Sequence, residues 1–92
     1  MFDPLLHQTV RSKLMSILIA NDAIPFKALK ESLAVTDGNL SSHLSKLEKE
    51  SYVLIEKTFE GKRPKTIVHI APKGRESFDR YIEALKQFIE DN

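Results

Sequence analysis

The amino-acid sequence predicts one mainly helical α+β domain that spans residues 1–92. A chain of 92 residues has the length of a single domain. Apolar side chains recur at helical spacing in four stretches, and two runs rich in aliphatic and β-branched residues, at 52–58 and 66–70, have the composition of strands. The chain has no cysteine, which excludes a disulfide framework, a thiolate metal site and a cysteine nucleophile.

The first predicted helix begins near the N-terminus and runs to about Ala20. Asp3 is expected to cap it, with Pro4 in its first turn, where a missing N–H group costs nothing. Its apolar positions follow helical spacing: Leu6, Val10, Leu14, Ile17 and Leu18. Asn21 and Asp22 interrupt the pattern and end the helix.

The next two predicted helices are short and lie within residues 25–50. Pro25 begins the first of them, and Thr36 is a favourable N-terminal cap for the second. About three residues join the two helices, which is typical of a helix-turn-helix. The second helix carries an apolar stripe formed by Leu40, Leu44 and Leu47.

A β-hairpin and a last helix complete the predicted fold. The hairpin covers residues 52–70, with a long loop at 59–65 between its two strands. Pro72 begins the last helix, which runs over residues 72–90. A basic two-stranded hairpin directly after a helix-turn-helix predicts a winged helix, with a C-terminal helix available for dimerisation.

One face of the third helix has the chemistry of a nucleic-acid contact. At 100° per residue, the side opposite the leucine stripe collects small polar side chains and lysines. Such groups suit base edges and phosphates, but they also occur on any solvated helix face. The residues that we expect to contact DNA from this helix are Thr36, Gly38, Asn39, Ser41, Ser42, Ser45 and Lys46.

The distribution of charge favours the nucleic-acid interpretation. The net charge of the whole chain is only +1, but residues 57–75 contain six basic residues and one acidic residue. Lys62, Arg63 and Lys65 on the hairpin are therefore expected to hold DNA backbone or a minor groove. The alternative is an edge hairpin that is kept soluble by its charge, but its position beside a helix-turn-helix favours binding.

Several segments together resemble a known family of regulators. They read TDGNLS at residues 36–41, HL at 43–44, KLE at 46–48, EKTFEGKRP at 56–64 and PKGR at 72–75. The sequence is similar over nearly its whole length to small winged-helix regulators of the MarR/ArsR-like superfamily. The resemblance implies a homodimeric transcriptional regulator that places its third helix in the major groove and its wing beside it.

Three positions depart from that family's pattern. Ser42 stands where relatives often carry Arg, which removes a phosphate or guanine contact. Ser51 replaces a glycine after the third helix, and a left-handed backbone there would cost about 1 kcal/mol. Ala71 replaces the common Thr or Ser before Pro72, so the last helix lacks a side-chain cap worth about 1 kcal/mol.

The last helix has an apolar stripe that is wider than one small domain needs. It can pack on the first helix of its own chain or against a second subunit, and the dimer is favoured because it also explains recognition of a palindromic operator. The expected dimer residues are Leu5, Leu6, Phe78, Tyr81, Ile82, Leu85, Phe88 and Ile89.

Other chemistry finds little support in the sequence. His7, His43 and His69 lie in three different elements, so no metal ligand set or cofactor is expected, and His43 is expected to pack at the edge of its helix. No catalytic residues are assigned, because consecutive Ser41, Ser42 and His43 do not face one another on a helix.

The cellular setting and one rival function complete the expectations. No stretch is long enough to span a membrane, which predicts a cytoplasmic protein. The rival is a winged helix that binds a partner protein instead of DNA. The charge of the third helix supports this alternative, because its two lysines, Lys46 and Lys49, are outnumbered by three acidic residues. These acidic residues are Asp37, Glu48 and Glu50.

Overall fold

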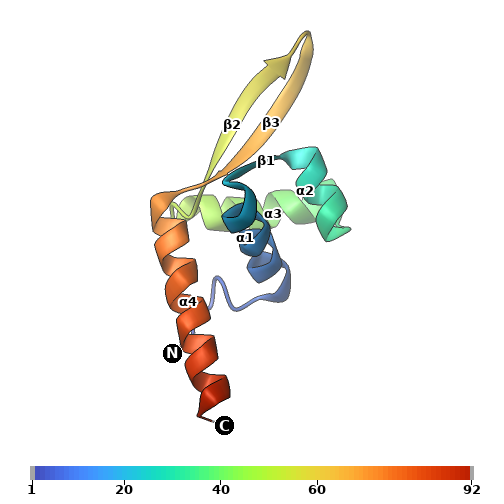
Figure 1. Ribbon diagram of the computed structural model, residues 1–92. Coiled ribbons are helices and arrows are strands. Elements are labelled where there is room, and N and C mark those ends of the chain that lie inside the picture. Colours follow the sequence, from blue (N-terminus) through green and yellow to red (C-terminus); the bar gives the residue numbers. More distant parts are fainter. Residues whose placement is uncertain (1, 92) are drawn as a thin grey trace.

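The computed structural model describes residues 2–91 and has four helices and three strands within them. The helices gather around one core, the hairpin of the last two strands projects from it, and the last helix runs out in the opposite direction (Figure 1). The elements are α1 (Thr9–Asn21), β1 (Ala23–Pro25), α2 (Phe26–Leu33), α3 (Asp37–Lys49), β2 (Val53–Glu60), β3 (Arg63–Ile70) and α4 (Pro72–Glu90). The predicted winged helix is confirmed.

The core lies where α1 meets the helix-turn-helix and the base of the hairpin. Complete burial of an aliphatic side chain contributes about 1.5–3 kcal/mol, so this cluster is the main source of stability. Its fully buried members are Leu6, Leu14, Met15, Leu18, Leu29, Leu40, Leu47, Val53 and Val68.

The predicted start of the first helix is wrong by about one and a half turns. α1 begins at Thr9, after Gln8, whose side-chain oxygen accepts a hydrogen bond from the amide of Arg11 at 3.0 Å. Asp3 caps a separate turn instead, with one carboxylate oxygen 3.0 Å from the amide nitrogen of Leu5. Its other carboxylate oxygen accepts a hydrogen bond from the hydroxyl of Tyr52, which ties this turn to the start of the hairpin.

The helix-turn-helix follows the prediction closely. The hydroxyl of Thr36 accepts a hydrogen bond from the amide of Asn39 at 3.1 Å and caps α3. Ala34 ends α2 in a left-handed conformation with φ of 54°. An ion pair of 2.8 Å between Lys30 and Asp37 joins the two helices beside this turn, and the predicted leucine stripe of α3 is buried.

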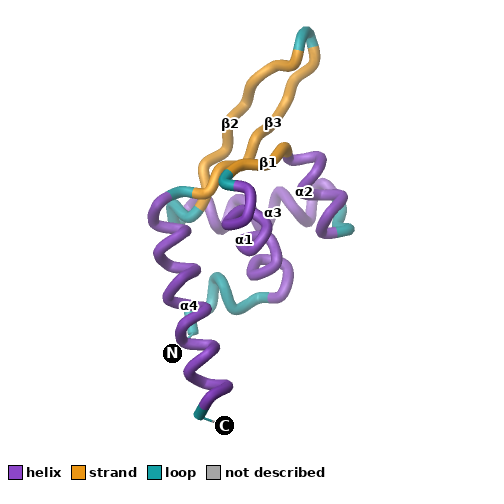
Figure 2. The backbone as a smooth tube through the Cα atoms, in the orientation of Figure 1, coloured by secondary structure: helices purple, strands orange, loops and turns teal. Residues whose placement is uncertain are grey.

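The sheet has a third strand that the sequence did not predict. β1 pairs antiparallel with β3, so the strand order is β1-β3-β2, and Figure 2 shows β1 crossing the base of the hairpin. Ile24 lies opposite Val68 in this pairing. Pro25 therefore ends a strand as well as preceding α2, because its extended backbone serves both elements.

The hairpin, called the wing below (residues 53–70), has no long loop. Its strands continue to Glu60 and Arg63, which face each other across a two-residue turn. Gly61 begins this turn with φ of 64°, a conformation that favours glycine. Pro64 lies opposite Phe59, in the pair next to the closing pair. Hydrogen-bonded and non-hydrogen-bonded pairs alternate in an antiparallel ladder, so Phe59 and Pro64 form a non-hydrogen-bonded pair, and proline needs no amide donor there.

Two features fix the hairpin to the helices that flank it. Ser51 has φ of 62°, so its backbone is left-handed, and its amide and that of Tyr52 donate hydrogen bonds back to α3. At the start of α4, a Cβ on Gly74 would lie 2.0 Å from the carbonyl oxygen of Tyr52. Ala71 precedes α4 without a side-chain cap, as predicted.

Candidate nucleic-acid interface

The seven α3 residues expected to contact DNA are all exposed, from Thr36 at the cap to Lys46 in the last turns. The opposite side of the helix is anchored in the core by its leucines. Packing does not demand a glycine at Gly38, since a Cβ there would meet nothing within 4 Å. The helix therefore presents a continuous polar surface with open backbone near its N-terminus.

His43, on the same helix, packs inward and is buried, whereas the sequence predicted packing only at the edge of the helix. Its Nδ1 lies 3.1 Å from an Nη atom of Arg11, and Arg11 also donates from Nε to the carbonyl oxygen of Leu5 at 2.6 Å. Burial, followed by the positive charges of Arg11 and Lys46, lowers the pKa of His43 from its usual value of 6.5. A neutral His43 accepts the hydrogen bond of Arg11, so this pair positions α3 against α1.

Sequence reasoning missed the burial of Arg11, which is only 9% exposed. The available signal was helical spacing, because Arg11 precedes Leu14, Met15 and Leu18 on the face of α1 that is buried. An arginine at such a position requires acceptors, and the structure supplies a carbonyl oxygen and an imidazole nitrogen.

The two faces of the wing differ in chemistry. Residues directly opposite each other in the ladder share a face, so Lys57 and Thr66 lie on one face of the wing. Arg63 and Lys65 lie an odd number of residues from Thr66 on β3, so they lie on the other face. Lys65 forms a 2.7 Å ion pair with Glu60. Two of the predicted wing contacts, Arg63 and Lys65, therefore lie on the same face of the wing, and Lys57 lies on the other face.

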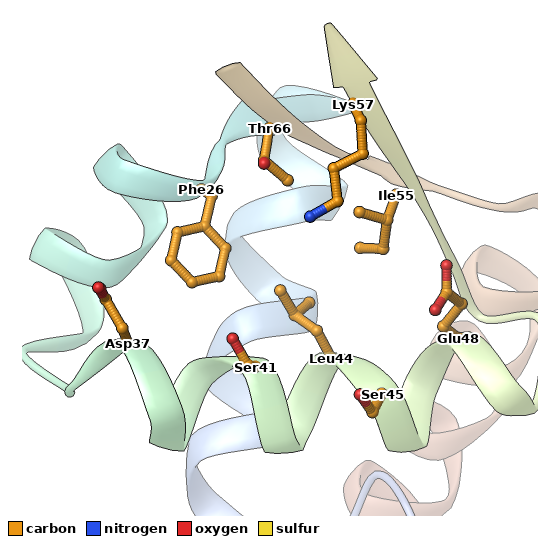
Figure 3. A pocket seen from close by; sticks show the side chains of 9 residues that line it. All are labelled: Phe26, Asp37, Ser41, Leu44, Ser45, Glu48, Ile55, Lys57 and Thr66. Carbon is orange, nitrogen blue, oxygen red and sulfur yellow. The ribbon is translucent and has the colours of Figure 1, made fainter. Parts of the chain in front are cut away.

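A groove of about 440 Å³ lies between α3 and the wing (Figure 3). Ser41 and Ser45 of α3 line one side, and Lys57 and Thr66 of the wing line the other. Lys57 extends from β2 into the space between the two elements. Sequence reasoning did not include Lys57 among the contacts. The signal was available, because alternate residues of a strand share a face and Lys57 therefore lies on the same side of the hairpin as Val53 and Ile55.

The expected dimer residues divide into two groups. Leu6, Phe78 and Tyr81 are buried within the single chain, so they mainly form its core. Leu5 and Leu85 are half-buried. The side chains exposed on α4 are Ile82 at 37%, Phe88 at 50% and Ile89 at 65%.

Comparison with known proteins identifies the fold and its family. A model of the winged helix DNA-binding domain matches residues 10–89. The chain belongs to this winged helix family. An uncharacterized protein of Methanocaldococcus jannaschii is 41% identical over 81 residues, which make up 88% of each chain.

Solved structures agree with that assignment. The winged helix superposes on a transcriptional regulator homologue from Pyrococcus horikoshii OT3 with a TM-score of 0.90 and 33% identity, over 95% of this chain and 86% of that one. A MarR-family transcriptional regulator from Silicibacter pomeroyi gives a TM-score of 0.70 at 25% identity, over 90% of this chain and 55% of that one. The resemblance to MarR/ArsR-like regulators is confirmed, and DNA is the partner that the family supports.

Residues 2–91 of the winged helix offer no ligand cluster for a metal ion. No three His, Cys, Asp or Glu side chains in this range come together as metal ligands. His7 bonds to the hydroxyl of Tyr81 at 3.0 Å, and His69 bonds to Glu56 at 2.8 Å, so both have partners other than a metal. No helix in the same range is both long and apolar enough to cross a membrane.

Proposed function

We propose that this winged helix is a transcriptional regulator that acts in the cytoplasm as a homodimer and binds palindromic double-stranded DNA. The observation that carries the proposal is the exposed polar face of α3 together with the basic residues of the hairpin. Figure 1 shows this hairpin projecting from the helices. α3 enters the major groove, and Thr36 and Gly38 let the DNA backbone approach its first turn. The side chains that face base edges and phosphates are Asn39, Ser41, Ser42, Ser45 and Lys46.

The tip of the wing extends the contact beyond the major groove. Lys62 and Arg63 are exposed and belong to no ion pair among residues 2–91. A guanidinium suits a narrow minor groove, and a lysine suits phosphates. Lys65 belongs to the same hairpin, but its charge is already paired with Glu60.

The experiment is selection of bound duplexes from a random pool, followed by affinity measurements against salt. Arg63→Ala and Lys62→Ala are expected to weaken binding, with about 0.9 of log–log salt slope lost for each phosphate contact removed. Unchanged affinity and slope in both variants would refute the wing contact. No retention of the wild-type protein on duplex DNA below about 50 mM salt would favour the rival function, a protein-interaction module.

The homodimer is proposed to form through α4, which carries exposed apolar residues. Figure 1 shows this helix running out from the rest of the domain. A two-fold axis there would set two copies of α3 about one helical turn, roughly 10 bp, apart. Ile82→Glu is expected to yield a monomer in light scattering and to lose preference for a palindrome over a half-site. Gln87→Glu, which adds the same charge elsewhere on α4, serves as the control and should leave a dimer.

A further inference from the structure

The groove between α3 and the wing is built from side chains of complementary kinds. Its floor is apolar, formed by Phe26, Leu44 and Ile55. Hydroxyl groups of Ser41 and Ser45 lie along α3, and Thr66 lies on the wing (Figure 3). A deoxyribose-phosphate chain needs this combination, because its sugars are largely apolar and its phosphates accept hydrogen bonds.

Lys57 is the cation of this groove. It is exposed, it extends from β2 into the space above Leu44, and it forms no ion pair with any residue in 2–91 (Figure 3). An ammonium group without an internal carboxylate partner keeps its charge available for an external anion. Lys65, on the opposite face of the same hairpin, is neutralised by Glu60 at 2.7 Å.

We propose that one sugar-phosphate strand of DNA lies in this groove and that Lys57 pairs with one of its phosphates. The inference rests on the proposed function. If α3 occupies a major groove and the wing tip the adjacent minor groove, then the strand that separates those two grooves has to pass between α3 and the wing. The groove is the space that these two elements leave for it, and Lys57 is the wing's principal phosphate contact there.

Two carboxylates limit where the strand can lie. Asp37, at one end of the groove, is paired with Lys30 at 2.8 Å. Glu48, at the other end, has no ion pair within residues 2–91, so it repels a phosphate. The strand therefore lies nearer to Ser41 and Ser45, and Glu48→Gln is expected to raise DNA affinity.

The test compares Lys57→Gln with two other lysine-to-glutamine variants in the full chain. Affinity for a selected duplex is measured by fluorescence anisotropy over about 50–300 mM salt. Lys57→Gln is expected to lower the salt slope by about 0.9 per protomer, or about 1.8 for a dimer. Lys65→Gln should lower it by less than half as much, because its charge is already paired. Lys86→Gln, on α4, is the control that should match the wild type.

Neutral methylphosphonate linkages, placed one at a time in the duplex, identify the phosphate. At one position the substitution should weaken the wild-type protein but leave Lys57→Gln unaffected, since the interaction is already missing there. Equal salt slopes for Lys57→Gln and Lys86→Gln, or a larger loss for Lys65→Gln than for Lys57→Gln, would overturn the inference. Binding that depends on Lys62 and Arg63 but not on Lys57 overturns the inference alone, whereas a wild-type protein that binds no duplex overturns the proposed function as well.

Discussion

Gly74 offers a test in which helix propensity and packing predict opposite signs. It lies in the first turn of α4, and replacing a helical glycine by alanine ordinarily stabilises a protein by about 1 kcal/mol. Here the new Cβ would lie 2.0 Å from the carbonyl oxygen of Tyr52 and 2.8 Å from its carbonyl carbon. Both are backbone atoms, so the clash is not relieved by a side-chain rotation. α4 has to move by about 1 Å or more to restore contact distances.

That movement has a calculable cost. Overpacking of this kind costs about 1–3 kcal/mol. The shift also disrupts the 3.0 Å hydrogen bond from the amide of Ala71 to the same carbonyl, worth about 1 kcal/mol. After subtraction of the propensity gain, Gly74→Ala should lower the free energy of unfolding by about 2 kcal/mol, which corresponds to a fall in Tm of roughly 8–16 °C for a domain of this size.

The assay is urea and thermal unfolding followed by circular dichroism, with Gly38→Ala as the matched control. A Cβ at Gly38 meets nothing within 4 Å, so that substitution should leave stability unchanged or raise it by up to about 1 kcal/mol. The two variants make the same chemical change in the first turn of a helix. A Gly74→Ala protein as stable as the wild type would refute the packing argument.

The remaining predictions concern caps and pH. Ser51→Gly should raise the free energy of unfolding by about 1 kcal/mol in urea denaturation, because the left-handed backbone with φ of 62° strains serine and not glycine. Thr36→Ala should lower it by about 1 kcal/mol in the same assay through loss of the α3 cap. The lowered pKa of His43 means that the unfolded chain binds a proton more readily than the folded one, so stability is complete above the usual pKa of 6.5 and falls as the pH drops from there toward the folded pKa. Urea denaturation at about pH 8 and about pH 5 should show a smaller acid loss for His43→Gln, and an equal loss would contradict the assignment.

The helix-turn-helix was predictable because its signals are local. The hydroxyl of Thr36 accepts a hydrogen bond from the amide of Asn39, only three residues along the chain. The leucine stripe of α3 likewise repeats within one helix. The predicted start of the first helix was wrong because it depends on a contact between residues far apart in the sequence. Asp3 does cap a turn, but its second carboxylate oxygen is held by Tyr52, 49 residues away, and the chain begins α1 only at Thr9.

The sheet shows the same limit. β1 has three residues and depends on β3 for its hydrogen bonds, so neither length nor composition distinguishes it from a loop. The sequence predicts a long loop around the wing turn because glycine, proline and charged residues are depleted in strands. Pairing overrides that preference, since Pro64 lies at a position where no amide donor is needed. The exposure of the predicted DNA contacts on α3 followed from the helical spacing of its leucines. The ion pair of Lys65 with Glu60 and the groove around Lys57 depend on how the strands pair and on which face of the wing is turned toward α3, which the sequence alone does not show.

The structure also changes what the basic segment means for binding. Six basic residues in 57–75 would release about 5.4 counterions per protomer if each met a phosphate. Three of them already have carboxylate partners: Lys65 with Glu60, Lys73 with Glu50 and Arg75 with Asp22. Within residues 57–75, the cations that form no ion pair with a residue in 2–91 are Lys57, Lys62 and Arg63, and these three contribute a salt slope of at most about 2.7 per protomer. Because this segment supplies so small an electrostatic contribution, the proposed homodimer depends for its DNA affinity on the polar face of α3, including Lys46, and on its two copies binding together.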